Sequence, residues 1–552
     1  MLANFFNLPH TMKKKEGDFF IVSIILLIAF ILRFYKLDVH SYRADEVERI
    51  LFALKPVIEI FKTDFRSPMY CFILHWWIRI FSDSEIATRL LSVLLNVFTI
   101  IPLYALVYRL RDKKTAQIFS IFIAVSPYYI LHSRIAENFS IFLLFISLSV
   151  LFFIKIFEDK FSIKNSIFYA FSTIFMLYSS PTGLVILLFE WVWFFQKWRF
   201  TRMTLRVWLI IQSCIFLVYT HWLSLIFSEL YSGWAAFDRL SLKGGFIGRL
   251  AYAIYSFTIG QTIYPWNWRL VIPVIIIFAV ISMFAIRTLK GKYRIVSFIV
   301  PLFIIGLLPV FSNRGAPEYC IGSSIAYYIF IAVGISVLKK RSLALGAIIL
   351  IYLNGCSIFN LYKDREYLNQ SFTDDWRKVA YFVNNVVDSY PEYIKNDSLN
   401  LSSPPERNVP FTIVVYRPGP FMWYYKKAGR STNKTSGVDS LKMAFYKSVS
   451  RNYPRVPSPV VVFKPSHPNL VIKKAMNTNI IFVENIESGS FAYEKKGLSV
   501  FSKWLNANCN QLFVANFWED KGYKEKKKLL KRDLPEYRMK VSLYTPKVLP
   551  VK

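Results

Sequence analysis

The chain contains few of the residues that build metal centres and disulfide frameworks. Only five of its 552 residues are cysteines, and only six are histidines. The cysteines form no CxxC pair and show no metal-ligand spacing; they are Cys71, Cys214, Cys320, Cys356 and Cys509. The sequence therefore predicts neither a disulfide framework nor a zinc site.

Acidic residues are also scarce: 35 Asp and Glu stand against 68 Lys and Arg, which gives a net charge of +33. In a soluble protein such an excess would favour nucleic acid as a partner. This chain, however, is 54% hydrophobic and 18% aromatic, which is unusual for a soluble protein of this size. We therefore expect membrane lipids and phosphate-bearing lipids as partners, and no nucleic acid.

Long apolar runs recur from residue 19 to about residue 360, and each can form a membrane-spanning helix. A cleaved signal peptide does not explain the first run, because no small-residue cleavage site follows it and many further runs come after it. The sequence predicts a polytopic α-helical membrane domain over residues 1–360 with about eleven spans. These are 19–35, 86–108, 115–132, 138–154, 165–178, 181–196, 205–227, 270–286, 295–311, 321–338 and 342–360.

The loops between the predicted spans differ in charge. One alternate set carries 21 basic residues against four acidic ones, at 12–16, 108–114, 155–164, 196–206, 287–294 and 339–341. Short loops rich in Lys and Arg stay in the cytoplasm. We therefore expect a multi-pass protein of the inner (cytoplasmic) membrane with a cytoplasmic N-terminus. Because the number of predicted spans is odd, residues 361–552 are expected outside.

The first outer loop, 36–85, contains two apolar segments that are too short to span a membrane. In residues 46–61, seven apolar residues recur at helical spacing: Val47, Ile50, Leu51, Leu54, Val57, Ile58 and Phe61. The second segment has Ser67 as the expected N-cap and Pro68 at the first helical position. Both are predicted to be helices that lie in the membrane interface.

Residues 361–552 change composition and predict a soluble, extracytoplasmic α/β domain. Strand-like runs lie at 411–416, 460–464, 479–485, 511–515 and 538–544, and helical stretches lie at 374–387, 418–428, 496–507 and 521–531. This alternation favours a mainly parallel sheet. The basic run at 521–532 is either a solvated helix face or a contact with anionic lipid.

The adjacent acids Asp45 and Glu46 are the first candidate site. An exposed loop pair is the simplest explanation of two such residues. Their place between a predicted span and an interfacial helix, on the side opposite the basic loops, favours chemistry instead. A third acid, Glu190, falls inside a predicted span, where we expect it at the membrane interface or paired with Lys197.

Several arginines lie on predicted outer loops, against the charge bias. Arg134 and Glu137 are three residues apart on the turn between the third and fourth spans, a spacing that shares one helical face. A simple pair that caps the turn is the alternative. Arg314 precedes the tenth span, and Arg66 lies in the first outer loop. Because arginine can grip a phosphate through two parallel hydrogen bonds, we predict that Arg134, Arg314 and Arg66 bind phosphate.

The order of these motifs resembles the GT-C superfamily of membrane glycosyltransferases, and glycosyltransferase family 39 in particular. That family and its bacterial relatives include protein O-mannosyltransferases and lipid A aminoarabinose transferases. The resemblance extends from residue 19 to about residue 430. The similar segments are the Asp-Glu pair, RSPMYCFILHWWIRIFSDSEIATRL (66–90), SPYYILHSRIAENFSIFLL (126–144), SNRGAPEYC (312–320) and DDWRKVAYFV (374–383).

The resemblance implies an inverting hexosyl- or pentosyltransferase. It would move a sugar from a polyprenyl-phosphate donor to a lipid, glycan or protein acceptor outside the cytoplasmic membrane. Asp45 matches the family's catalytic acid, and Glu46 is its neighbour. Arg134 and Glu137 match a Ser-Arg motif followed by an acid, and Arg314 matches an arginine of the late outer loop.

The chain departs from the family pattern at three places. Arg66 and Ser67 precede the proline of the first loop, where relatives often have His or Lys. Gly315 follows the late-loop arginine in place of Tyr, and Glu137 replaces the Asp of the mannosyltransferases. The resemblance implies no required cofactor or metal, and a divalent ion held by Glu46 beside Asp45 is the alternative.

A transporter or lipid flippase without transferase activity is the competing class. Such a protein should show inverted repeats, with polar groups at broken helices near the membrane midplane. This chain instead concentrates its outer charges at one face, which favours the enzyme. An envelope assembly scaffold is a third class, and in a scaffold Asp45 would be replaceable.

Overall fold

A computed structural model describes most of the helical part of the chain and the main elements of its C-terminal part. The described residues are 16–64, 66–158, 162–197, 202–237, 245–263, 268–311, 317–338, 354–362, 376–383, 411–415, 421, 423–424, 460–462, 472, 479–485, 492–519 and 537–546. The chain divides into two compact units, and each is described by itself. The first comprises residues 1–37 and 55–369, and the second comprises residues 38–54 and 370–552.

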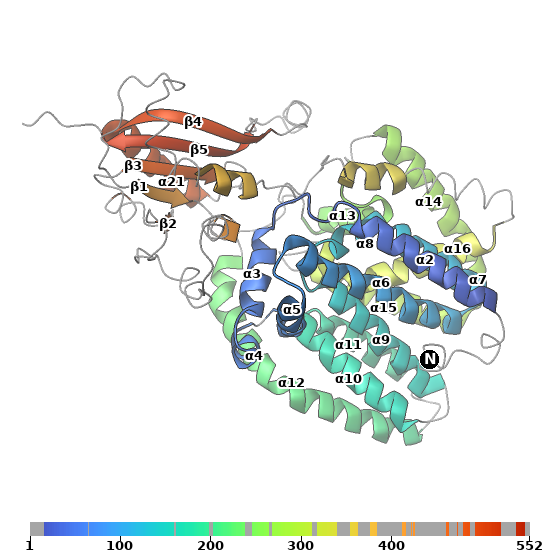
Figure 1. Ribbon diagram of the computed structural model, residues 1–552. Helices are drawn as coiled ribbons and strands as arrows, with labels where there is room; N and C mark the ends of the chain where they lie inside the picture. Colours follow the sequence, from blue (N-terminus) through green and yellow to red (C-terminus); the bar gives the residue numbers. More distant parts are fainter. Residues whose placement is uncertain are drawn as a thin grey trace, which may run out of the picture. The chain divides into compact units, whose positions relative to one another are not determined.

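The first unit is a bundle of apolar helices (Figure 1). Its helices are α2 (Glu16–Phe34), α4 (Val57–Thr63), α5 (Pro68–Ile80), α6 (Glu85–Leu110), α7 (Lys113–Val125), α8 (Pro127–Ser133), α9 (Phe139–Glu158), α10 (Ile163–Ser179), α11 (Gly183–Lys197), α12 (Arg202–Phe237), α13 (Gly245–Ile259), α14 (Trp268–Leu289), α15 (Tyr293–Gly306) and α16 (Ile321–Ser336). Two short 3-10 helices, η2 (Leu308–Phe311) and η3 (Pro317–Cys320), lie between α15 and α16.

Among the described residues, six helices are long and apolar enough to cross a membrane, and a seventh span results if α7 and α8 count as one. These two helices meet at a 54° bend. Three shorter apolar helices lie at Phe20–Phe34, Gly183–Gln196 and Phe246–Ile259. The polytopic helical fold is confirmed. The count of eleven stays a prediction, because the last predicted span is described only from residue 354 and α13 was not expected.

The polar break at residues 178–183 is a hairpin turn between two helices. The Tyr169 hydroxyl of α10 donates a hydrogen bond of 2.8 Å to Oε2 of Glu190 on α11. In one continuous helix these residues would lie about 30 Å apart along the axis, at about 1.5 Å per residue. Helices α10 and α11 therefore fold back beside each other, as the two predicted spans require.

Glu190 lies fully buried in the bundle. Its Oε1 accepts a hydrogen bond of 2.7 Å from Ser149 of α9, and Gln212 of α12 donates to the Tyr169 hydroxyl at 2.9 Å. The expectation that Glu190 reaches the membrane interface is therefore wrong. Donors on neighbouring helices satisfy the carboxyl group inside the bundle, so it has no need to reach water. The side chain of Lys197 lies outside the described residues.

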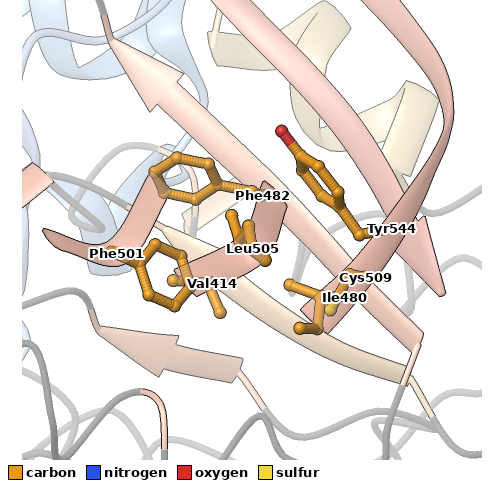
Figure 2. Close-up of a cluster of buried hydrophobic side chains, with 7 residues drawn as sticks. All are labelled: Val414, Ile480, Phe482, Phe501, Leu505, Cys509 and Tyr544. Carbon is orange, nitrogen blue, oxygen red and sulfur yellow. The ribbon is translucent and has the colours of Figure 1, made fainter. Parts of the chain in front are cut away.

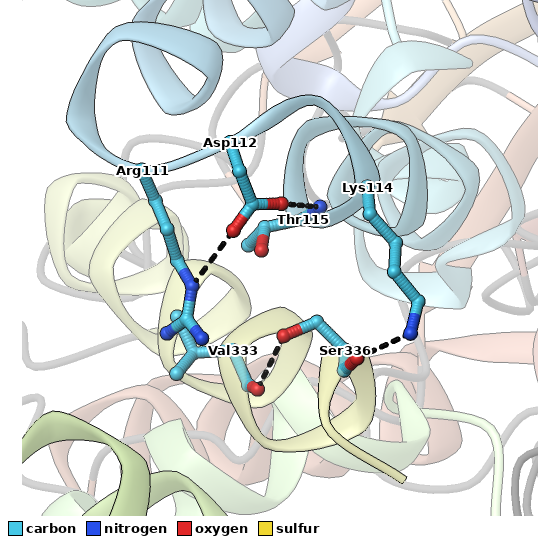
Figure 3. A network of polar contacts seen from close by, with 6 residues as sticks. All are labelled: Arg111, Asp112, Lys114, Thr115, Val333 and Ser336. Atoms are coloured by element: carbon cyan, nitrogen blue, oxygen red, sulfur yellow. Dashed lines mark hydrogen bonds and ion pairs between the residues drawn. The ribbon is translucent and has the colours of Figure 1, made fainter. Parts of the chain in front are cut away.

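Two of the predicted cytoplasmic loops and the end of α16 meet at one end of the bundle. The Lys114 ammonium, at the start of α7, donates to the carbonyl oxygen of Ser336 at the end of α16 (Figure 3). Arg294, at the start of α15, donates to the carbonyl of Arg109 at 3.0 Å. These contacts hold the loops at 108–114 and 287–294 and the end of α16 on one side of the bundle, in agreement with the predicted alternation of charge. The basic loop at 339–341 lies outside the described residues.

The turn between α6 and α7 is organised by Asp112. Its Oδ1 accepts a hydrogen bond of 2.8 Å from the backbone N–H of Thr115, and its Oδ2 lies 3.0 Å from Nε of Arg111 (Figure 3). Asp112 is thus the N-cap of α7. Partial burial opposes the charge of this carboxyl, but the hydrogen bonds from Thr115 and Arg111 outweigh it and lower its pKa below the ordinary value of 3.8.

The second unit contains a five-stranded sheet in the order β2-β1-β3-β5-β4. Its elements are α3 (Ala44–Ala53), β1 (Phe411–Val415), β2 (Val460–Val462), β3 (Asn479–Asn485), α21 (Ala492–Asn508), β4 (Cys509–Glu519) and β5 (Tyr537–Pro546). Strand β1 pairs in parallel with β2 and β3, whereas β5 pairs antiparallel with both β3 and β4. The expected mainly parallel sheet is therefore only half right, because β4 and β5 pair directly as antiparallel neighbours, which needs no crossover helix.

One face of this sheet shares a hydrophobic core with α21 (Figure 2). The buried side chains of this core come from β1, β3, α21, the start of β4 and β5; they are Val414, Ile480, Phe482, Phe501, Leu505, Cys509 and Tyr544. The rings of Phe482 and Phe501 meet edge to face with their centroids 5.2 Å apart. The predicted α/β architecture is confirmed by this packing. The helical stretch expected at 521–531 lies outside the described residues.

Replacing the N-cap of α7 tests the predicted turn. Asp112→Ala should lower the free energy of unfolding by about 1 kcal/mol at neutral pH, because the N–H of Thr115 loses its acceptor. Asp112→Asn keeps an acceptor at the same place and should cost much less.

Thermal unfolding of the purified protein in detergent micelles measures both effects. Since the folded carboxyl stays charged to lower pH than the unfolded one, its stabilisation is complete above the ordinary pKa of 3.8 and disappears as the pH falls through the lower folded value. Equal losses in the two variants at pH 7 would contradict the capping role.

Candidate functional site

The adjacent acids Asp45 and Glu46 have different environments. Both lie in the first turn of α3, where Asp45 is exposed and the side chain of Glu46 is fully buried. Oε2 of Glu46 accepts a hydrogen bond of 2.9 Å from the backbone N–H of Arg43, the residue at the N-cap. Glu46 therefore stabilises the start of α3, while Asp45 presents its carboxylate at the surface of its unit.

The apolar segment at 46–61 forms two short helices instead of one. Helix α3 ends at Ala53, and α4 begins after Pro56, whose ring fixes φ and removes an N–H donor. The division between the two units also falls between α3 and α4. The expected continuous amphipathic helix is therefore wrong. Val47 and Ile50 of α3 are buried, whereas Ile58 of α4 is exposed.

Arg134 binds the end of a neighbouring helix. It lies at the C-cap of α8, and its guanidinium donates to three carbonyls at and just after the end of α2: those of Arg33 at 3.0 Å, Lys36 at 2.8 Å and Tyr35. The ring of Tyr362 lies 5.1 Å from the guanidinium carbon. The predicted phosphate-binding residue thus satisfies carbonyls that a helix terminus leaves without partners.

Arg33 and Arg89 complete this arrangement. Together with Arg134 we call them the arginine collar. Nη1 of Arg89, on α6, donates to the carbonyl of Leu37 at 2.9 Å. Arg33 is fully buried on α2 and donates to the carbonyls of Ile123 and Ala124 at 3.0 and 2.8 Å, at the end of α7. The collar was not predicted from the sequence, although a charge inside an apolar run is a signal for such a role.

Lys36 shows why the end of α2 needs this support. Its φ of 54° lies in the left-handed region, which costs a non-glycine residue about 1–2 kcal/mol. This conformation is common just after a helix end, where glycine usually takes it. The bond from Arg134 to the Lys36 carbonyl holds the chain in the strained conformation, immediately before the segment that carries Asp45.

Glu137 and Arg134 do not share a helical face. Helix α8 ends at Ser133, and residues 134–138 form a non-helical turn before α9. The N–H of Glu137 donates to the carbonyl of Ile135 at 2.8 Å within this turn. The helical-face argument for the pair is therefore wrong, because the chain leaves the helix at Arg134 itself.

The start of α5 is held by an acid that the sequence analysis missed. Buried Asp64 accepts hydrogen bonds on Oδ1 from the backbone N–H groups of Arg66 at 3.0 Å and Ser67 at 3.2 Å. Trp222 of α12 donates to the Asp64 carbonyl at 3.4 Å. Pro68 takes the first helical position as predicted, but the Ser67 side chain makes no capping bond.

The predicted site residues thus fall in different parts of the structure. Asp45 and Glu46 belong to the second unit, and Arg66, which is half-buried, belongs to the first with Arg134. Arg314 lies outside the described residues, so its role stays a prediction. Within the described part of the chain, no group of three or more His, Cys, Asp or Glu side chains could hold a metal ion.

Comparison with known proteins agrees with this architecture. Residues 65–224 match the family model described as dolichyl-phosphate-mannose-protein mannosyltransferase. The fold is similar to that of the ArnT protein of Cupriavidus metallidurans in the apo state, with a TM-score of 0.52, 11% identity, and coverage of 95% of this chain and 97% of that one.

The fold is also similar to the oligosaccharyltransferase of Archaeoglobus fulgidus in the apo form. That comparison gives a TM-score of 0.51 at 12% identity and covers 88% of this chain and 71% of the other. A search of curated protein sequences found no match. At these identities the solved structures show a common fold.

Replacing Arg134 separates a structural role from phosphate binding. Arg134→Ala should lower the free energy of unfolding by about 2–3 kcal/mol, because buried carbonyls at the end of α2 lose their donor. Arg134→Lys should recover only part of this loss, since an ammonium cannot reach all three carbonyls.

Arg66→Ala is the matched control, because Arg66 is half-buried and lies on another segment of the same unit. It should leave the apparent unfolding temperature within about one degree of wild type. An Arg134→Ala protein as stable as wild type would show that the collar is not structural.

Proposed function

Because the chain resembles the GT-C glycosyltransferases of family 39 in its sequence motifs and its fold, we propose that it is an inverting glycosyltransferase. Its donor is a sugar linked to polyprenyl phosphate, and its acceptor is a hydroxyl of a lipid, glycan or protein. The transfer takes place on the outer face of the cytoplasmic membrane. Nucleotide sugars are cytoplasmic, so an outer site implies a donor carried by a lipid.

This proposal rests on the different environments of the two adjacent carboxylates, Asp45 and Glu46. Glu46 is buried and bonded to the backbone of Arg43, whereas Asp45 is exposed on the first turn of the same helix. A general base must reach the proton that it removes. Of the two acids, Asp45 can do so without unfolding the start of α3.

In the proposed reaction, Asp45 takes the proton of the acceptor hydroxyl. The acceptor oxygen then attacks the anomeric carbon, and the bond from that carbon to the phosphate oxygen breaks. The polyprenyl phosphate leaves with the electron pair of this bond and needs no added proton. One carboxylate therefore suffices, and a single displacement inverts the anomeric configuration.

The departing phosphate gains negative charge and requires cationic partners. Arg134 is engaged with the end of α2, so we assign donor-phosphate binding to Arg66 among the described predicted arginines, and to Arg314. This differs from the sequence-based prediction, in which Arg134 shared that role. No metal is required, because the leaving phosphate is stabilised by side chains.

Transfer itself tests the proposal against a transporter or flippase. The purified protein in lipid nanodiscs is given undecaprenyl-phosphate-linked mannose, glucose or aminoarabinose, together with an envelope extract as acceptor source, and release of undecaprenyl phosphate is followed. Asp45→Asn should lower the rate by about 10²–10⁴-fold, the usual effect of losing a general base.

Glu46→Gln is the matched control, since its amide oxygen can still accept from Arg43. It should keep a rate within about threefold of wild type. An Asp45→Asn protein that retains more than about a third of the wild-type rate would refute the base. If Glu46→Gln loses activity while Asp45→Asn keeps it, Glu46 is the general base instead.

The side of the membrane on which the second unit lies has its own test. Lys503 is exposed on α21, so Lys503→Cys should react with a membrane-impermeant maleimide in intact spheroplasts. Lys290, exposed on a predicted cytoplasmic loop, gives the control Lys290→Cys, which should react only after permeabilisation. Native Cys509 is buried in the core of the unit and can stay. The opposite labelling order would place the second unit in the cytoplasm.

A further inference from the structure

The segment that leads into α3 has no regular structure of its own. Residues 38–40 form turns and bends, residues 41–43 have no regular secondary structure, and Arg43 at the N-cap of α3 is extended. No helix or strand hydrogen bonds therefore fix the direction in which α3 starts. Because Asp45 lies in the first turn of α3, the position of its carboxylate depends on whatever holds this segment.

Residues from the C-terminal part of the same unit hold its backbone. The Tyr424 hydroxyl accepts a hydrogen bond of 2.7 Å from the N–H of Tyr42. Nη2 of Arg377 donates to the carbonyl of Asp38 at 2.9 Å, and the N–H of Arg377 donates to the Ser41 hydroxyl at 3.2 Å. Three bonds thus join two distant parts of the chain within a few residues of Asp45.

Aromatic packing closes around these bonds. Tyr42 is only 1% exposed, and its ring centroid lies 6.1 Å from those of both Trp423, edge to face, and Tyr424, stacked. The guanidinium carbon of Arg377 lies 5.9 Å from the centroid of the Tyr424 ring. Trp376, next to Arg377, is also buried. The Tyr42 backbone bond is therefore shielded from water, which strengthens it.

From this geometry we propose that Arg377 and Tyr424 are positioning residues for Asp45. They fix residues 38–42, which sets the start of α3 and presents the Asp45 carboxylate to the acceptor. The C-terminal part of the chain is then required for catalysis through a specific contact, and not only for acceptor binding. This inference rests on the proposed function, in which Asp45 is the base.

The expected effect is on the chemical step. A displacement of a catalytic group by about 1 Å can cost about 100-fold in rate. Tyr424→Phe removes one hydroxyl and leaves the ring, so we expect kcat to fall by about tenfold while KM for the lipid-linked sugar stays unchanged. Arg377→Lys should have a similar or larger effect, because the ammonium cannot make the same contacts.

Tyr544→Phe is the matched control. It removes a tyrosine hydroxyl from the core of the same unit, in β5, and should leave kcat within about twofold of wild type. The assay uses the undecaprenyl-phosphate sugar that the wild type consumes among mannose, glucose and aminoarabinose. Apparent unfolding temperatures are measured for all variants.

Hydrogen–deuterium exchange of the full-length protein gives a second readout that needs no substrate. Amides of residues 38–46 should exchange faster in Tyr424→Phe than in wild type or Tyr544→Phe, while those of the strands stay protected. If Tyr424→Phe does not fold, Arg377→Lys carries the same two measurements.

The inference is overturned if kcat and exchange at 38–46 match wild type, or if kcat falls only in proportion to lost folded protein. Failure of Asp45→Asn to reduce the rate would instead refute the base, and the exchange result would still show whether Arg377 and Tyr424 hold the segment. The two failures are therefore distinguishable.

Discussion

The end of α2, just before the segment that carries the candidate base, depends on how its backbone carbonyls are satisfied. A helix that ends among apolar neighbours leaves carbonyls without donors, and burying them unpaired would cost about 1–3 kcal/mol each. Arg134 and Arg89 supply these donors from α8 and α6. Because each guanidinium carries several N–H groups in a fixed plane, Arg134 alone can serve three carbonyls.

The same solution recurs at the bend between α7 and α8. Helix α7 stops before Pro127, and Arg33 donates to its last carbonyls from within α2. Helix α2 therefore supports the end of α7 through Arg33, and Arg134 after α8 supports the end of α2. This reciprocal arrangement explains how charged residues can stay buried in an apolar bundle. Their donors bind backbone carbonyls and, in the case of Nε of Arg33, the side-chain oxygen of Asn96.

A second consequence concerns the acids themselves. With the end of α2 fixed at Leu37, the next residues enter the second unit, where Arg377 and Tyr424 bind them and Glu46 completes the start of α3. The N–H groups of Tyr42 and Arg43, the carbonyl of Asp38 and the hydroxyl of Ser41 each have a hydrogen-bond partner within this unit. Asp45 stands apart because it is exposed, and this asymmetry turns a pair of equivalent acids into one candidate base.

Much of the fold could be predicted from hydrophobic periodicity. Long apolar runs predicted α6, α9 and α14 with ends that differ by up to four residues, and the β-branched runs predicted β1 and β3 to within one residue. Helix α13 was missed because Gly245, Gly248 and Arg249 interrupt its apolar run.

The remaining features of the fold and the site depend on tertiary contacts, which hydrophobic periodicity does not predict. The direction of β5 is set by its neighbours β3 and β4, and the three partners of Arg134 are backbone atoms, which leave no sequence motif. The break between α3 and α4 could have been predicted from the sequence, because a proline just before a helix start is a known boundary signal. Of the candidate site, the acids could be predicted, but which of the two is buried could not.

A structure of the Asp45→Asn protein with an undecaprenyl-phosphate-linked sugar that the wild type consumes tests the central claim most directly. Without its base the enzyme should hold the donor intact. The account predicts that the side chain at position 45 faces the anomeric carbon across a space for one acceptor oxygen, while Glu46 remains bonded to the N–H of Arg43. A sugar whose anomeric carbon faces Glu46, released from that N–H, would contradict it.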